Sequence, residues 1–272
     1  MRFKDPVCVN VLSPLSLRSP MDFLRAVRTY EEVFPNVLPE KWGWWEPLNQ
    51  TFDAQNVEAL VPAAGTCETV FWQRKKYPKA EGAFSVRWCS KSPMVNDTHS
   101  NIDLTLELAE VEQDSLVHAL ETLSVRTEAD IAILDVANAR YKDFAFDSAS
   151  TPFGERFMLV THVLRHWLPD VFWGTVFGPP YVQLFGKDRL MSAPAAVVKE
   201  LGEEMIYLQL TDKLADTIYN FDAVLASRSA VKAHLAVDAF FQSERAYDRA
   251  EKGPTGDLFV TPEFQLRVDE KE

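Results

Sequence analysis

The feature that most constrains the fold is a strand, a helix and a second strand that follow one another between residues 101 and 136. In the first strand, polar and apolar side chains alternate: Ile102, Leu104, Leu106 and Leu108 point to one face, and Asp103, Thr105 and Glu107 to the other. A helix over about residues 113–123 and an apolar strand over 131–136 follow. The predicted fold class is therefore α+β: mainly antiparallel sheets, with helices packed on one face and the other face at least partly exposed to water.

The 272-residue chain shows two halves of similar pattern. In each half a predicted helix leads into Leu-Pro-acid and then into Trp-Gly, at residues 38–43 and again at 168–174. We predict an N-terminal α+β half over residues 1–140 and a C-terminal α+β half over 155–272, packed as one compact unit. Because the shared pattern is short, a true duplication and a chance similarity both stay open.

The densest apolar stretch covers residues 167–194, which hold two Trp, three Phe and one Tyr. We predict that it forms core, with the side chains of Trp173, Phe177, Tyr181 and Phe185 buried. Strands are expected near residues 171–177 and 181–185. A helix is expected to start at residues 192–194 and to end at Gly202, because glycine commonly follows the last helical turn.

Charge and composition exclude several functions. The formal net charge of −12 opposes direct binding of nucleic acid, because phosphates are repelled at range. The chain contains neither of the two common glycine-rich phosphate-binding motifs. Its three cysteines lack metal-binding spacing and are interpreted as free thiols. No apolar run is long enough for a signal peptide or a membrane span, so we expect a cytoplasmic protein that does not bind membranes.

A strongly acidic stretch is the clearest candidate for a binding surface. Between residues 92 and 125 there are seven Asp and Glu residues and no Lys or Arg. Such a stretch is often only a solvated face. It can also meet a basic partner surface and speed association. The candidate partner-binding residues are Asp103, Glu107, Glu110, Glu112 and Asp114.

Candidates for catalysis are few. His162 and His166 have the spacing at which two helical imidazoles can hold one metal ion, but the glutamate of the H-E-x-x-H motif is missing. No nucleophile elbow is present. We therefore predict no catalytic residues, no metal and no cofactor. The alternative is a metal-dependent hydrolase that uses His162 and His166.

Several aromatic motifs resemble those of the immunity protein 52 family, which are bacterial antitoxins of polymorphic toxin and type VI secretion systems. These motifs are Trp-Gly-Trp-Trp-Glu-Pro-Leu at residues 42–48, Trp-Leu-Pro-Asp at 167–170 and Gly-Pro-Pro-Tyr-Val-Gln-Leu-Phe-Gly at 178–186, with Pro194 behind them. The resemblance implies a cognate nuclease toxin of restriction-endonuclease-like fold, neutralised by tight binding. It implies no catalytic residues. On this basis we expect a non-enzymatic immunity protein whose partner is the toxin.

Overall fold

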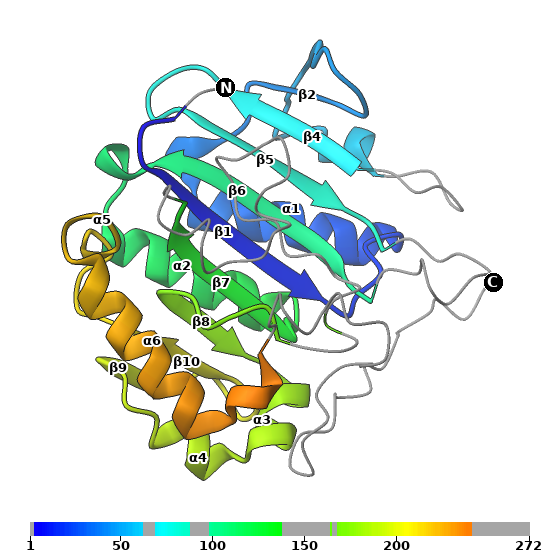
Figure 1. The fold of residues 1–272 in the computed structure, drawn as a ribbon. Coiled ribbons are helices and arrows are strands. Elements are labelled where there is room, and N and C mark those ends of the chain that lie inside the picture. The colour runs from blue at the N-terminus through cyan, green and yellow to red at the C-terminus, as the bar shows by residue number, and fades with distance from the viewer. Residues whose placement is uncertain (1–2, 62–68, 88–97, 138–163, 165–167, 241–272) are drawn as a thin grey trace, which may run out of the picture.

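The computed structural model describes residues 3–61, 69–87, 98–137, 164 and 168–240. Within them, ten strands form one antiparallel sheet in the order β3-β2-β4-β5-β6-β1-β7-β8-β10-β9 (Figure 1). The strands are β1 Pro6–Ser13, β2 Lys41–Gly43, β3 Gln50–Thr51, β4 Thr69–Arg74, β5 Ala80–Ser85, β6 Ser100–Glu107, β7 Ile131–Val136, β8 Gly174–Phe177, β9 Val197–Glu200 and β10 Ile206–Gln209. The α+β class and the antiparallel sheet predicted from the sequence are confirmed.

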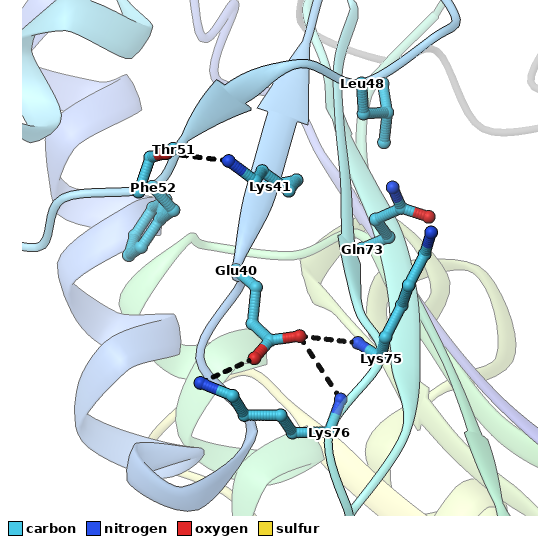
Figure 2. A pocket seen from close by; sticks show the side chains of 8 residues that line it. All are labelled: Glu40, Lys41, Leu48, Thr51, Phe52, Gln73, Lys75 and Lys76. Atoms are coloured by element: carbon cyan, nitrogen blue, oxygen red, sulfur yellow. Dashed lines mark hydrogen bonds and ion pairs between the residues drawn. The ribbon is translucent and has the colours of Figure 1, made fainter.

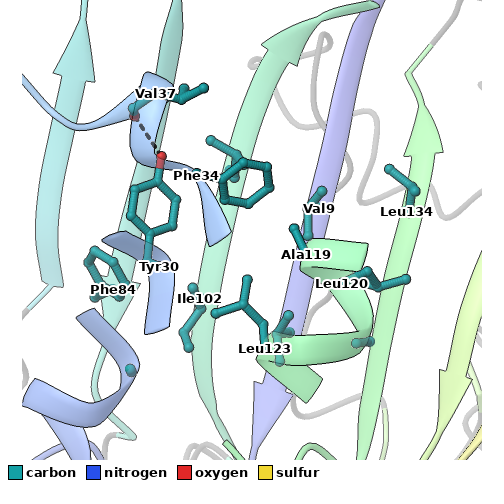
Figure 3. Packing of buried hydrophobic residues seen from close by; sticks show 14 of the residues in the cluster. Val9, Tyr30, Phe34, Val37, Phe84, Ile102, Ala119, Leu120, Leu123 and Leu134 are labelled. Atoms are coloured by element: carbon teal, nitrogen blue, oxygen red, sulfur yellow. Dashed lines mark hydrogen bonds between the residues drawn. The ribbon is translucent and has the colours of Figure 1, made fainter. Parts of the chain in front are cut away.

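Two long helices cover one face of the sheet. They are α1 (Pro20–Val33) and α2 (Gln113–Arg126), which lie behind the strands in Figure 1. Alternate residues of β1, such as Val9, pack against them together with Ile102 of β6 and Leu134 of β7 (Figure 3). Tyr30 of α1 is buried in this core, where its hydroxyl donates a hydrogen bond of 2.9 Å to the carbonyl oxygen of Val37.

The remaining main helices cover the opposite face, over the C-terminal strands. These are α3 (Pro179–Phe185), α4 (Lys187–Met191) and α6 (Phe221–Leu235), seen in front of the sheet in Figure 1. Their core takes the other alternate residues of the central strands, for example Cys8 of β1 and Ile133 of β7. The expectation that helices cover a single face is therefore wrong for the sheet as a whole. The reason lies in β1 and β7, which are buried along their whole length and so need cover on both sides.

The short elements connect these layers. They are α5 (Asp216–Tyr219) and the 3-10 turns η1 (Pro35–Val37), η2 (Val57–Leu60), η3 (Leu108–Glu110) and η7 (Val237–Ala239).

The aromatic stretch is core, as predicted. Trp173, Phe177 and Tyr181 are at most 1% exposed, and Phe185 is 8% exposed. Two of its expected elements are wrong, however. Residues 181–185 form helix α3 rather than a strand, because two prolines directly after Gly178 favour a helix start.

The helix expected before Gly202 is also wrong, since residues 197–200 form edge strand β9 instead. Gly202 has a positive φ of 69° and lies in the connection from β9 to β10, which pair antiparallel. A left-handed glycine serves such a turn as well as it serves a helix end, so the residue type alone does not distinguish the two.

A buried ion pair joins strand β7 to helix α6. The carboxylate of Asp135, on β7, accepts hydrogen bonds from the guanidinium of Arg228 on α6 at 3.1 Å and from the backbone N–H of Trp173 at 2.9 Å. The Asp135 side chain is 0% exposed and that of Arg228 4%. The sheet itself also passes directly from β7 to β8. The predicted boundary between residues 140 and 155 lies outside the described residues. No duplication is evident among the residues that are described.

Candidate partner-binding surface

The first two predicted acidic residues lie on strand β6. Asp103 and Glu107 point away from the core that holds Ile102 and Leu104, and both are half-buried. Asp103 lies opposite Asn10 and Ala83 in the middle of the sheet, while Glu107 lies at the strand end, opposite Pro6. Four residues along a strand separate the two side chains by about 13 Å, so they do not form a compact pair.

The other three predicted acids lie where β6 turns into α2. Glu110 is half-buried, and its carboxylate accepts the backbone N–H of Lys79 at 2.6 Å. Glu112 occupies the N-cap position of α2 and Asp114 lies in its first turn, and both are exposed. Negative charge is favourable there because the helix N-terminus carries a partial positive charge. We call residues 107–114 the acidic turn; it contains four of the five predicted site residues, and Asp103 lies apart from it.

The structure adds a neighbour that the sequence did not indicate. The side chain of Gln113 donates a hydrogen bond to the carbonyl oxygen of Asp212 at 3.0 Å and accepts one from the backbone N–H of Leu214 at 2.7 Å. This places exposed Asp212 next to the acidic turn, and α5 with its Tyr219, 83% exposed, follows directly. About a hundred residues separate the two segments in sequence, so no local pattern could have revealed the contact.

A basic hairpin lies at the same end of the sheet. The connection between β4 and β5 contains Lys75, Lys76, Tyr77 and Lys79, of which Tyr77 is 70% exposed. We call residues 75–79 the β4–β5 tip. It adjoins the acidic turn through the bond from the Lys79 backbone to Glu110. Its sequence, Arg-Lys-Lys-Tyr-Pro-Lys from residue 74, is a local run of basic residues, and none of these residues is among the predicted site residues.

A shallow pocket opens beside the β4–β5 tip on the sheet face opposite α1 (Figure 2). Its position follows from strand alternation: Trp42 and Trp72 are buried towards α1, so their neighbours Lys41 and Gln73 point to the other side. The pocket has a volume of about 580 Å³ and is lined by Glu40, Lys41, Leu48, Thr51, Phe52, Gln73, Lys75 and Lys76.

Two side chains hold the β4–β5 tip in place. The Glu40 carboxylate accepts the backbone N–H groups of Lys75 at 2.8 Å and Lys76 at 3.2 Å and pairs with the Lys76 ammonium at 3.1 Å. These contacts, the bond from the Lys75 backbone foremost, lower the pKa of Glu40. On the other side, the guanidinium of Arg74 donates to the carbonyl oxygens of Leu38, Tyr77 and Pro78 at 3.1–3.3 Å.

Clusters of metal-binding side chains and pairs that contain histidine are the remaining candidates for chemistry among the described residues. Among them, no group of three or more His, Cys, Asp or Glu side chains is arranged to hold a metal ion. His162 and His166 lie outside the described residues. His99 lies 2.9 Å from Asp130, and both side chains are buried. More exposed, the Ser192 hydroxyl lies 3.3 Å from Nε2 of His234, and the same nitrogen lies 2.9 Å from the carbonyl oxygen of Arg189. No helix in the described ranges is long and apolar enough to cross a membrane.

Comparison with known proteins gives a likeness of fold. No known family profile matches the chain, and no curated protein matches it in sequence. Among solved structures, the Pseudomonas aeruginosa T6SS protein PA0821 is similar, with a TM-score of 0.55 and 10% sequence identity. The match covers 95% of this chain and 81% of that one, so the whole fold is shared rather than one segment of it.

Proposed function

We propose that this chain is an immunity protein, an antitoxin that binds and neutralises a cognate toxin of a type VI secretion system. The observation that carries the proposal is the likeness of fold, along 95% of the chain, to a protein described as a T6SS protein. The aromatic motifs at residues 42–48, 167–170 and 178–186, which resemble the immunity protein 52 family, are a second line of support, although no family profile matches the chain. We propose a nuclease of restriction-endonuclease-like fold as the toxin.

The charge of the chain fits this partner. A nuclease binds phosphates and therefore carries basic surface. An inhibitor with a net charge of −12 and an acidic turn attracts such a surface over a distance and is oriented by it. The acidic turn is our proposed contact, through exposed Glu112 and Asp114 and half-buried Glu107.

The direct test uses the product of the neighbouring gene as the candidate toxin. Its expression in a bacterial host should arrest growth, and co-expression of the full chain should relieve the arrest and yield a complex on size-exclusion chromatography. A catalytically inactivated toxin variant is the control, since it should bind the chain without arresting growth. A folded chain that neither relieves the arrest nor forms the complex would refute the assignment.

The alternative function, a metal-dependent hydrolase, is separated from this one by two measurements. Under our proposal the double variant His162→Ala/His166→Ala protects cells as well as the unaltered chain does, and the purified protein holds no stoichiometric metal. Zinc or manganese at one ion per chain, together with loss of protection in the folded double variant, would favour the hydrolase.

A further inference from the structure

We propose that the β4–β5 tip and the pocket beside it form a second contact, which takes an acidic surface of the partner protein. This inference rests on the proposed function, because it assigns a further part of the same interface. The residues of this second contact lie outside the acidic turn, and their charge is positive rather than negative.

The tip is positively charged, whereas the chain as a whole is negatively charged. Three of its five residues are lysines and none is acidic, and Arg74 directly precedes it, whereas the chain as a whole has 28 basic and 40 acidic residues. Lys41 adds a further cation at the pocket. A protein that is kept soluble by an acidic surface does not need such a cluster, since it lowers the magnitude of the net charge.

The two nearby acids offset only part of the positive charge of the tip. Glu40 and Glu110 accept backbone N–H groups of the tip, and the ion pair between Glu40 and Lys76 uses one of the ammonium groups. For Lys75 and Lys79, no ion pair is found within the described part of the chain. In Figure 2 the Lys75 side chain extends along Gln73 towards Leu48, across the pocket and away from the Glu40 carboxylate.

The tip is also held in one shape before it meets a partner. The hydrogen bonds of Arg74 and Glu40 fix it from two sides. Such preorganisation lowers the entropy lost on binding. Tyr77 lies between the lysines and is 70% exposed, and tyrosine is one of the residue types enriched among those that contribute most to interface energies. Rigid backbone, exposed aromatic ring and unneutralised lysines together indicate a protein interface.

Carboxylates of a protein fit this site better than the phosphates of a nucleic acid. A nucleic acid is a polyanion over its whole length and is repelled by the net charge of −12 and by the adjoining acidic turn. A protein can present a local cluster of Asp and Glu to the tip and basic residues to the acidic turn beside it. The two surfaces would then specify both the partner and its orientation.

The test compares two variants of equal net charge in the full chain. The tip variant is Lys75→Gln/Lys76→Gln/Lys79→Gln, and the dispersed control is Arg25→Gln/Arg126→Gln/Lys187→Gln, three exposed residues outside both the tip and the acidic turn. Both remove three positive charges, so long-range attraction to the toxin changes equally. Affinity for the inactivated toxin is measured at about 50 mM and about 300 mM NaCl, because salt screens exposed charges.

We expect the tip variant to bind about tenfold more weakly at low salt and the control to change less than about twofold. Lys75→Glu alone should weaken binding in the same direction, and it leaves both the Glu40 pair and the Glu110 contact in place. Equal affinities for the tip variant and the control, with the unaltered chain binding the toxin, would overturn this inference alone. An unaltered chain that fails to bind would overturn the proposed function and this inference with it.

A second arm decides the class of ligand. A labelled DNA duplex of about 20 base pairs should show no binding at about 100 mM NaCl, close to physiological ionic strength. Binding of the duplex that the tip variant abolishes and the control retains would assign the tip to nucleic acid and overturn the protein assignment.

Discussion

Replacing Asp135 tests how strongly β7 is held to α6 and to the segment before β8. In Asp135→Ala the guanidinium of Arg228 loses this buried carboxylate, and the backbone N–H of Trp173 loses its acceptor. Removing one partner of a buried ion pair costs about 3–5 kcal/mol, because the other charge is left buried. We therefore expect the free energy of unfolding to fall by about that amount.

The reverse substitution should cost less. In Arg228→Met the Asp135 carboxylate keeps two backbone donors, from Val136 at 2.7 Å and from Trp173 at 2.9 Å. A loss of about 1.5–3 kcal/mol is expected, the range for hydrogen bonds to charged groups. The double variant Asp135→Ala/Arg228→Met should be less destabilised than the sum of the single ones, with a coupling energy of about 1–3 kcal/mol.

Urea denaturation followed by tryptophan fluorescence measures all three values. An Asp135→Ala loss below about 1 kcal/mol, or additive effects in the double variant, would refute the reasoning that this ion pair is a buried and mutually dependent link.

Three further predictions concern the core, the acidic turn and the β4–β5 tip. Trp173→Ala should lower the free energy of unfolding by about 3–5 kcal/mol, measured by denaturation, since a fully buried large side chain is removed. Replacing Glu107, Glu112 and Asp114 by Lys should slow toxin association at low salt, measured by stopped-flow, and at high salt the rate should approach that of the unaltered chain. An unchanged association rate in a folded variant would place the toxin contact elsewhere. Because the pKa of Glu40 is lowered below its ordinary value of 4.5, its hold on the tip is complete above that pH and is lost as the pH falls through the lower folded-state pKa. Hydrogen exchange at the backbone amides of the tip should therefore accelerate, relative to the rest of the chain, below about pH 4.5, and in Glu40→Gln this additional acceleration should be much reduced.

The sequence predicted most reliably the elements whose pattern is local. The alternation in residues 101–108 identified strand β6 and its buried face, and the helical spacing after residue 113 identified α2. Prediction was wrong where one residue type serves two structures, as with Gly202, or where closely spaced aromatic residues fit a strand and a helix equally, as in α3. The two-faced burial of β1 depends on partners about a hundred residues away, and no window of sequence contains them.

The candidate surface was predictable only in part. A run of acids without bases is visible in the sequence, and the structure brings Glu107, Glu110, Glu112 and Asp114 to one end of the sheet. The two hydrogen bonds from the Gln113 side chain to the loop before α5 could not be predicted from the sequence, because they join distant segments through an uncharged side chain. The lysines of the tip can be read directly from the sequence. Their rigid setting depends on Glu40, which lies 35 residues before Lys75 and gives no local signal.

The central position of β1 has a consequence for how the protein is made. This strand precedes both of its partners in the chain, since in the described sheet it pairs with β6 and β7, and Val7 lies opposite Val136. At about 5–20 residues per second, its second partner leaves the ribosome on the order of ten seconds later. During that interval an apolar strand without partners is open to wrong pairing. Pairing over so long a separation also slows folding itself. A cell that depended on this chain for protection would therefore need a store of it, folded in advance of any attack.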